Sequence, residues 1–318
     1  MKEFELIKKY FHPLTKSCEA SQNLIDDAAK IRLKKNEELI ISKDLFVEDV
    51  HFLMRDGGFK IASKLLRTNL SDLASSGATP LYYMLGFSKN KNTDANFLKQ
   101  FSQGLKSIQD EFDLSLIGGD TVNSKKLFFS ITIFGIAKKG KILSRNQAKE
   151  GDLIFISGTI GDAFLGLRKS DDRFLMSRHF FPTPRINLGK KLTERNLSNC
   201  AIDISDGLFA DLQHLCQASE LNAEINLNQI PLSQQARKFL EKNSQIKIKD
   251  LASGGDDYEL IFAVNPKNQK KILQLSKALK LDLTCVGKFK KSSTKKFSLI
   301  VRDEKNQKIT IKKLGYEH

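Results

Sequence analysis

The chain has 318 residues, a formal net charge of +15, 40% hydrophobic residues and 28% charged residues. This length suits two domains of ordinary size, and the apolar content is enough to build hydrophobic cores. No stretch approaches the roughly 20 consecutive apolar residues of a membrane helix. The N-terminal segment mixes charged and apolar residues and lacks the apolar core of a signal peptide. We therefore expect a cytoplasmic protein with no membrane partner.

The first half of the chain alternates strand-like and helix-like segments. A helix is expected over 59–77, because Ile61, Leu65 and Leu70 repeat at helical spacing. A strand is expected to lead into Gly118-Gly119, and on the plain structural interpretation Asp120 then shapes a turn. The expected elements of this half are strands 39–43, 81–87, 114–117 and 127–137 and helices 59–77 and 95–112.

A polar, basic and turn-rich segment over 138–151 separates this half from a second alternating series. Pro184 is expected at the first helical position of one helix, and Ser205 at the N-cap of another. The expected elements are strands 152–157, 201–204, 223–227, 258–264, 281–287 and 297–301 and helices 162–168, 184–196, 206–218, 233–242 and 267–279. The pattern predicts an α/β protein of two domains, with boundaries at 1–147 and 148–318.

The four cysteines and the many lysines exclude two further classes of protein. The cysteines are widely separated and form no CxxC pair, so we expect free thiols and neither a disulfide framework nor a zinc site. The lysines are spread along the chain without an accompanying aromatic RNA-binding box, zinc finger or basic arm. We therefore expect no nucleic acid partner, although a positive field suits anionic phosphorylated substrates.

The acidic residues are more informative, because they gather in short clusters against apolar runs. The clusters lie at 24–27, 42–52, 69–80, 116–122, 201–212 and 252–260. A carboxylate at the end of a buried strand needs a cationic partner. Mg²⁺ prefers such oxygen ligands and is usually shared with substrate phosphates. The clusters together favour a site for several Mg²⁺ ions and phosphate chemistry.

Each carboxylate also has a plain structural interpretation. On this interpretation, Asp206 caps a helix and Asp72 is a solvent-exposed residue of a helix. Asp72, however, lies beside the apolar stripe of its helix and not opposite it. The common nucleotide-binding signatures are missing. The chain has no GxGxxG, and 135–142 (GIAKKGKI) has Ile142 where a P-loop needs Ser or Thr. If nucleotide binds, another architecture must hold it.

A set of motifs in a fixed order resembles the bacterial thiamine-monophosphate kinase family. The motifs are 26–29 (DDAA), 42–44 (SKD), 69–74 (NLSDLA), 77–80 (GATP), 118–121 (GGDT), 201–208 (AIDISDGL), 253–260 (SGGDDYEL) and 315–316 (GY). The resemblance implies the two-domain fold of the aminoimidazole-ribonucleotide synthetase superfamily. It also implies that the N-terminal domain binds ATP and metal and forms a homodimer, and that the C-terminal domain is α/β.

The resemblance further implies the reaction, the final step of thiamine diphosphate biosynthesis. ATP phosphorylates thiamine monophosphate to thiamine diphosphate with Mg²⁺ and without a covalent protein intermediate, and a K⁺ requirement is left open. Because both reacting groups are phosphates, positioning and charge neutralisation carry most of the catalysis. No strong general base is needed, because a phosphate oxygen is already ionised near neutral pH.

Carried over residue by residue, the family pattern implies four sets of site residues. The metal set is Asp27, Ser42, Lys43, Asp44, Asp72, Asp120, Asp203 and Asp206. The ATP set is Phe112, Gly119, Asp120, Arg145 and Ser205. The thiamine monophosphate set is His51, Asp256 and Tyr316. The residues expected to be catalytic are Asp44, Asp120 and Arg145.

Three positions depart from the family pattern. Lys43 stands where the family usually has Thr, Ile25 stands where Gly usually precedes the Asp pair, and Asp256 replaces the usual Glu. Two other functions stay open at this point. One is another ATP-using enzyme of the same superfamily, such as a synthetase or a maturation ATPase. The other is a nucleotide-sensing or nucleic-acid-binding protein that catalyses no reaction.

Overall fold

The computed structural model describes residues 3–168, 171–294 and 296–316. Its chain divides into two compact units. The first unit comprises Met1–Leu73 and Ala78–Lys139, and the second comprises Ala74–Gly77 and Gly140–His318. No helix of the described residues is long and apolar enough to cross a bilayer.

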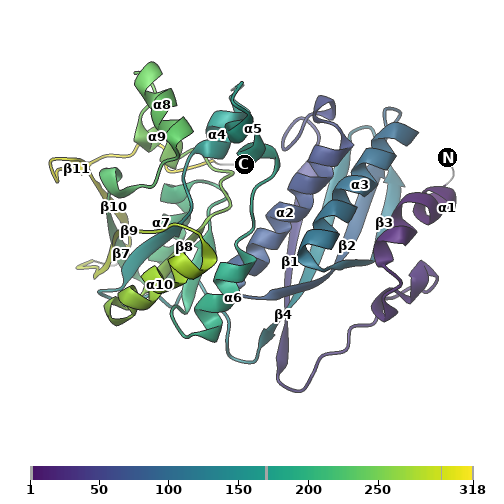
Figure 1. Ribbon diagram of the computed structural model, residues 1–318, viewed down its shortest axis with the longest axis horizontal. Coiled ribbons are helices and arrows are strands. Elements are labelled where there is room, and N and C mark those ends of the chain that lie inside the picture. Colours follow the sequence, from purple (N-terminus) through teal and green to yellow (C-terminus); the bar gives the residue numbers. More distant parts are fainter. Residues whose placement is uncertain (1–2, 169–170, 295, 317–318) are drawn as a thin grey trace. The chain divides into compact units, whose positions relative to one another are not determined.

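The first unit is a four-stranded sheet with two long helices on one face (Figure 1). In order across the sheet, its strands are β1 (Glu37–Val47), β4 (Phe128–Lys138), β2 (Thr79–Lys89) and β3 (Ser115–Asn123). The helices are α2 (Gly58–Ser76) and α3 (Ala95–Phe112). β4 pairs antiparallel with β1 and β2, whereas β2 and β3 are parallel and α3 connects them. A parallel pair needs such a crossover.

Aromatic packing builds the core of the first unit. The rings of Phe87, Phe101 and Phe129 are fully buried, and their centroids lie 4.7 to 5.3 Å apart. Gly104 of α3 allows the two helices to approach closely, since a Cβ there would lie 2.5 Å from the carbonyl oxygen of Phe59. This core holds α2 against the sheet, and so determines which part of strand β1 lies next to Asp72.

The expected helices of the first unit are confirmed, and one expected turn is wrong. Helix α3 begins where the Asp94 side chain accepts a hydrogen bond from the Phe97 amide at 2.7 Å, and it ends where Asp113 is left-handed. The strand expected to end at Gly118 continues as β3 to Asn123, so Asp120 lies within a strand and shapes no turn. It continues because Gly119 lets β3 approach β2: a Cβ there would lie 2.0 Å from the Leu85 oxygen.

The described residues of the second unit form a seven-stranded mixed sheet and seven α-helices (Figure 1). Its strands, in order across the sheet, are β11 (Lys308–Ile309), β10 (Leu299–Arg302), β7 (Leu221–Asn226), β9 (Leu283–Lys291), β5 (Leu153–Ser157), β8 (Leu260–Val264) and β6 (Cys200–Asp203). Its helices are α4 (Asp162–Leu167), α5 (Arg173–Phe180), α6 (Ile186–Glu194), α7 (Leu208–Ser219), α8 (Gln234–Lys242), α9 (Ile248–Ala252) and α10 (Gln269–Leu279). Only β7 and β10 pair in parallel among the described strands of this sheet.

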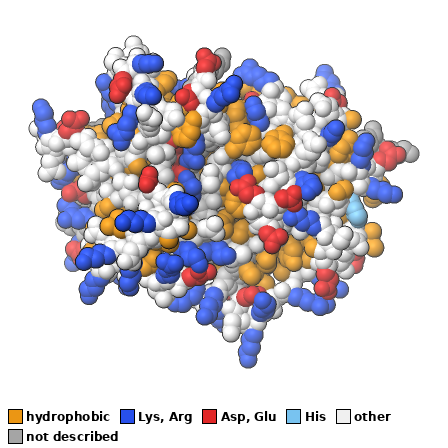
Figure 2. Space-filling model, in the orientation of Figure 1, with side chains coloured by type: hydrophobic (Ala, Val, Ile, Leu, Met, Phe, Trp, Pro, Cys, Tyr) orange, Lys and Arg blue, Asp and Glu red, His pale blue; other side chains and the backbone are white. Residues whose placement is uncertain are grey.

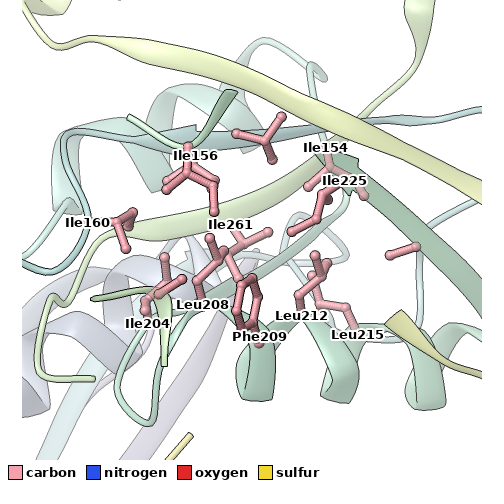
Figure 3. Close-up of a cluster of buried hydrophobic side chains, with 14 of the residues drawn as sticks. Ile154, Ile156, Ile160, Ile204, Leu208, Phe209, Leu212, Leu215, Ile225 and Ile261 are labelled. Carbon is pink, nitrogen blue, oxygen red and sulfur yellow. The ribbon is translucent and has the colours of Figure 1, made fainter. Parts of the chain in front are cut away.

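The core of the second unit lies between its sheet and helix α7. Ile154, Ile225 and Ile261 project from three strands toward Leu208 and Leu212 of the helix (Figure 3). The two leucines are four residues apart and so share one face of the helix. This packing places the start of α7, and the loop before it, at the end of strand β6.

Two expected helix starts in the second unit are wrong. Helix α7 begins at Leu208, and its N-cap is Gly207, not Ser205. The Ser205 carbonyl instead accepts a hydrogen bond from the Asp256 amide at 2.8 Å. Helix α6 begins at Ile186, so Pro184 lies before the helix and not at its first position. The sequence also predicted neither α5 nor α9.

All four cysteines are free, as expected. Burial raises the pKa of Cys200 to about 11 and that of Cys216 to about 12. Thiols with such raised pKa values are inert near neutral pH. Cys18 and Cys285 are only half-buried, and the four residues have packing roles in preference to chemical ones.

Candidate active site

In the first unit, strand β1 and helix α2 bring two expected metal residues together. Ser42, Asp44 and the buried Phe46 alternate along one face of β1. The Ser42 hydroxyl donates a hydrogen bond to the Asp72 carboxylate of α2 at 2.6 Å. This contact explains why Asp72 lies beside the apolar stripe of its helix, since the side chain turns toward the sheet. Asp44 lies two residues beyond Ser42 on the same face of the strand.

Lys43 has a different environment from its two neighbours. Its side chain projects from the opposite face of β1, where the amine donates a hydrogen bond to the Ser130 hydroxyl at 2.6 Å. A lysine ammonium has no acceptor and repels a cation. Only the backbone carbonyl of Lys43 is therefore able to serve a metal ion.

Asp27 lies in an exposed loop between the N-terminal helical turns and β1. The Asp27 amide donates to the Asp26 carboxylate at 2.9 Å. The preceding Gln22, Asn23 and Leu24 all have left-handed φ values, between 47° and 57°. In the part of the chain that the structure describes, the Asp27 carboxylate does not contact the Ser42–Asp72 pair.

The expected ATP residues of the first unit lie at two places. Asp120 is exposed on β3, and its carboxylate accepts a hydrogen bond from the Thr121 amide at 2.8 Å. Phe112 ends helix α3, and the Arg67 guanidinium lies over its ring at 5.7 Å from the centroid. Arg67 is itself held by Glu111. Phe112 is therefore a fixed aromatic surface at the end of its helix.

His51 lies in the turn that follows β1. Its ring stacks on Phe46 with centroids 5.3 Å apart, and its Nδ1 atom accepts a hydrogen bond from the Val47 amide at 3.1 Å. An imidazole nitrogen that accepts a hydrogen bond carries no proton. The neutral His51 ring therefore has its proton on Nε2, where it is a hydrogen-bond donor.

In the second unit, three segments distant in sequence meet near the start of helix α7. We call them the three-segment cluster: 203–207 (DISDG), 253–259 (SGGDDYE) and 315–316 (GY). Amides of Asp256 and Tyr258 donate to the carbonyls of Ser205 and Ile204, both at 2.8 Å. The Tyr316 amide donates to the Asp206 carbonyl at 2.9 Å. The cluster thus unites five of the expected site residues, namely Asp203, Ser205, Asp206, Asp256 and Tyr316.

A group of possible metal ligands lies at this cluster. Donor atoms of Asp206, Asp211 and His214 lie within 4.8 Å of one another. Burial raises the pKa of Asp211 well above its ordinary value, and the neighbouring Asp203 and Asp206 carboxylates raise it further. The Asp211 carboxylate also accepts hydrogen bonds from the amides of Asp206 and Gly207, both at 3.1 Å. Carboxylates that repel one another in this way fit a divalent cation.

Asp211 and His214 are absent from the expected metal set. The signal for them was present, because residues three apart share one face of a helix. The acidic cluster at 201–212 includes Asp211, but the family pattern assigned a metal role only to Asp203 and Asp206 of that cluster. Asp203, in contrast, is buried at the end of strand β6, as expected for a carboxylate that needs a cationic partner.

Asp256 and Arg145 are two further expected site residues, Asp256 from the thiamine monophosphate set and Arg145 from the ATP set. Asp256 has a left-handed backbone, with φ of 65°, and its carboxylate contacts the Tyr258 hydroxyl at 3.2 Å and the His179 Nδ1 at 3.4 Å. Arg145 is exposed in the segment before β5, and its carbonyl accepts a hydrogen bond from the Ser219 hydroxyl at 2.8 Å. Its guanidinium is therefore accessible to an anionic group.

The surface charge also bears on the nucleic acid question. Figure 2 shows lysine and arginine side chains scattered over the visible face, interrupted by acidic and uncharged groups. Nucleic-acid-binding proteins instead gather basic residues into a patch or stripe. The visible face therefore lacks the basic patch or stripe that such proteins present.

The two halves of the chain match the two parts of one family. Residues 25–137 match the AIR synthase related protein N-terminal domain, and residues 149–300 match the AIR synthase related protein C-terminal domain. The fold is therefore that of a two-domain, AIR-synthase-related protein, and the expected fold class is confirmed.

Comparison with individual full-length relatives assigns the chain to a more specific family. The chain is 37% identical to thiamine-monophosphate kinase of Haemophilus influenzae over 100% of this chain and 98% of that protein. The crystal structure of thiamine-monophosphate kinase from Stenotrophomonas maltophilia is 32% identical, covers 95% of this chain and 96% of its own, and gives a TM-score of 0.83. A structure of AaThiL complexed with AMPPCP and TMP is 26% identical over 99% and 97% of the chains, with a TM-score of 0.78. The chain belongs to the thiamine-monophosphate kinase family.

Proposed function

We propose that the protein transfers the γ-phosphoryl group of ATP to thiamine monophosphate, producing ADP and thiamine diphosphate. The name of the Haemophilus influenzae relative supports this reaction, as does the ATP analogue in the AaThiL complex. One observation in this chain carries the proposal: oxygen donors from separate elements lie close together in each unit. Ser42 meets Asp72 on β1 and α2, and Asp206 meets Asp211 at the start of α7.

The donor atoms fit magnesium, because they are carboxylate and hydroxyl oxygens. In the first unit, Asp27, Ser42, Asp44, Asp72 and Asp120 would hold Mg²⁺, with the carbonyl of Lys43. In the second unit, Asp203 and Asp206 would do so, and Asp211 joins them. Bound Mg²⁺ would neutralise negative charge on the phosphates. Several carboxylates in each unit agree with more than one ion.

The remaining site residues would bind and orient the two substrates. The Arg145 guanidinium provides a fork of donors that suits a phosphate of ATP. Phe112 offers an apolar ring, and Gly119 and Ser205 offer backbone groups to the nucleotide. His51 would donate from Nε2 to the thiamine phosphate, and Asp256 and Tyr316 would contact the same substrate. No residue of this set needs to form a covalent intermediate.

The proposal is tested by incubating the purified protein with ATP, Mg²⁺ and thiamine monophosphate and separating the products by chromatography. We expect thiamine diphosphate and ADP in equal amounts, and no product when the magnesium is chelated. Folded protein that makes no thiamine diphosphate would contradict the proposal. Repeating the assay with and without K⁺ decides whether a monovalent ion is required. A cytoplasmic location stays a prediction.

We also propose that the protein is a homodimer that pairs through the first unit. The face of β1 opposite Phe46 carries Ile41 and Leu45, which are 55% and 53% exposed. Exposed apolar side chains on the open face of a sheet suit an interface with a second copy. We expect Leu45→Glu to produce monomers in sedimentation velocity experiments. Leu273→Glu, a change of an equally exposed leucine on α10, is the control and should remain a dimer.

A further inference from the structure

A buried charge network lies directly behind the three-segment cluster. Glu259 is the last residue of the 253–259 segment, and its side chain is completely buried. Its carboxylate accepts hydrogen bonds from Arg178 at 2.6 Å, from Ser157 at 2.6 Å and from two nitrogens of Arg185, one of them at 2.6 Å. A buried carboxylate with this many charged and polar donors is held in one position.

The network is larger than one ion pair. Asp257 is also buried, and both of its carboxylate oxygens accept from the Gly161 amide, at 3.0 and 2.8 Å. Burial opposes the charge of Arg178, but the Glu259 and Asp257 carboxylates outweigh that effect and raise the pKa of Arg178. Two guanidinium groups therefore face several carboxylates, and removing one member leaves an unbalanced buried charge.

Successive side chains of the 256–259 segment differ in burial, and every second one points into the network. Asp257 and Glu259 point into the buried network, whereas Asp256 and Tyr258 are only half-buried. Asp256 and Tyr258 both have left-handed backbones, with φ of 65° and 51°. Such conformations are costly for residues other than glycine, so the surroundings must hold them.

Helix α5 connects the two sets of side chains. Arg178 bonds to Glu259, and the adjacent His179 contacts Asp256 at 3.4 Å. The fit around Glu259 is tight as well, since a Cβ at Gly158 would lie 2.2 Å from its carboxylate oxygen. The segment thus cannot shift without breaking either the buried bonds or the backbone bonds to Ser205 and Ile204.

We propose that Glu259 is a positioning residue: bound by Arg178, Arg185 and Ser157, it fixes the backbone of 256–258 and so orients the Asp256 carboxylate toward the acceptor substrate. The inference rests on the proposed function, in which Asp256 contacts thiamine monophosphate. Glu259 acts through Asp256 and touches no substrate itself.

The test uses Arg185→Lys, which keeps the buried charge but loses the two-pronged contact. Ser157→Ala is a second variant, since it removes one neutral bond and no charge. Arg302→Lys is the matched control, because Arg302 contacts Glu224 at 3.1 Å elsewhere in the second unit. In ligand-free protein, hydrogen exchange of the peptide spanning 253–259 should accelerate about tenfold in Arg185→Lys and Ser157→Ala and stay unchanged in Arg302→Lys.

Kinetics then separate positioning from general stability. Arg185→Lys should raise the KM for thiamine monophosphate about tenfold and leave the KM for ATP within about twofold. In an Asp256→Ala background, Arg185→Lys should cause no further rise, because both changes act on one contact. Additive effects, or equal changes in both KM values, would overturn the proposal. If the wild-type protein has no kinase activity, the proposed function fails, and unchanged exchange in 253–259 is then the result that overturns the positioning role.

Discussion

The two units hold their candidate site residues in different ways. In the first unit, Ser42 and Asp72 are on a long strand and a long helix, whose positions are set by the aromatic core. In the second unit, Asp206, Asp256 and Tyr316 are in irregular segments, which backbone hydrogen bonds and buried charges hold together. Substitutions in the first unit should therefore change ligand chemistry without moving the backbone. In the second unit, even substitutions remote from the substrate should move the backbone of the site.

The largest expected effect is the loss of a carboxylate in the first unit. Asp44→Asn and Asp120→Asn should each reduce kcat about a hundredfold or more, because each removes a negative ligand from a charge-neutralising site. The melting temperature should change by less than about 3 °C, since the core stays intact. Both quantities are measured on the same preparations. A large fall in melting temperature with an unchanged kcat would show a structural role instead.

A smaller effect is expected from the hydroxyl that orients Asp72. Ser42→Ala removes the 2.6 Å hydrogen bond to that carboxylate, and the Mg²⁺ concentration for half-maximal activity should rise about tenfold. The matched control is Ser102→Ala, which loses only a bond to the Lys99 carbonyl on an exposed face of α3. Magnesium dependence that is the same in both variants would contradict a metal role for Ser42.

The smallest expected effect concerns pH and the second unit. Burial raises the pKa of Asp257 well above its ordinary value. In the unfolded chain Asp257 has a lower pKa than in the folded protein. At pH values between these two pKa values, the folded protein binds more protons than the unfolded chain. The free energy of unfolding therefore falls as pH rises through this range. Asn does not titrate, so Asp257→Asn removes this pH-dependent loss of unfolding free energy, which amounts to about 1.4 kcal/mol for each unit of pKa shift. Urea unfolding should show the variant gaining stability relative to wild type as pH rises above about 4. A difference that is constant with pH would contradict this.

The fold was most predictable where apolar residues repeat regularly. Helix α3 has the expected bounds, because an amphipathic pattern lies between an Asp cap and a left-handed Asp113. Helix α5 was missed, because its inward residues include Arg178 and His179, which look like a solvated face. Their partners are Glu259 and Asp256, more than seventy residues away in the chain.

The sequence named a set of candidate site residues, but it did not show how they are arranged. The motif order identified the family, and this resemblance is confirmed. Spacing along the chain does not show that Ser42 meets Asp72, thirty residues away. The roles of the individual residues stay predictions. Long-range contacts of this kind depend on packing and not on local periodicity.

The most direct test of the central claim follows the transferred phosphoryl group itself. The protein is mixed with ATP labelled in its γ-phosphoryl group, Mg²⁺ and unlabelled thiamine monophosphate in a single turnover. We predict that the label appears in the terminal phosphate of thiamine diphosphate at the rate at which labelled ATP disappears, with none left on the protein. Label released only as free phosphate, or retained on the protein, would contradict direct transfer between the two phosphates.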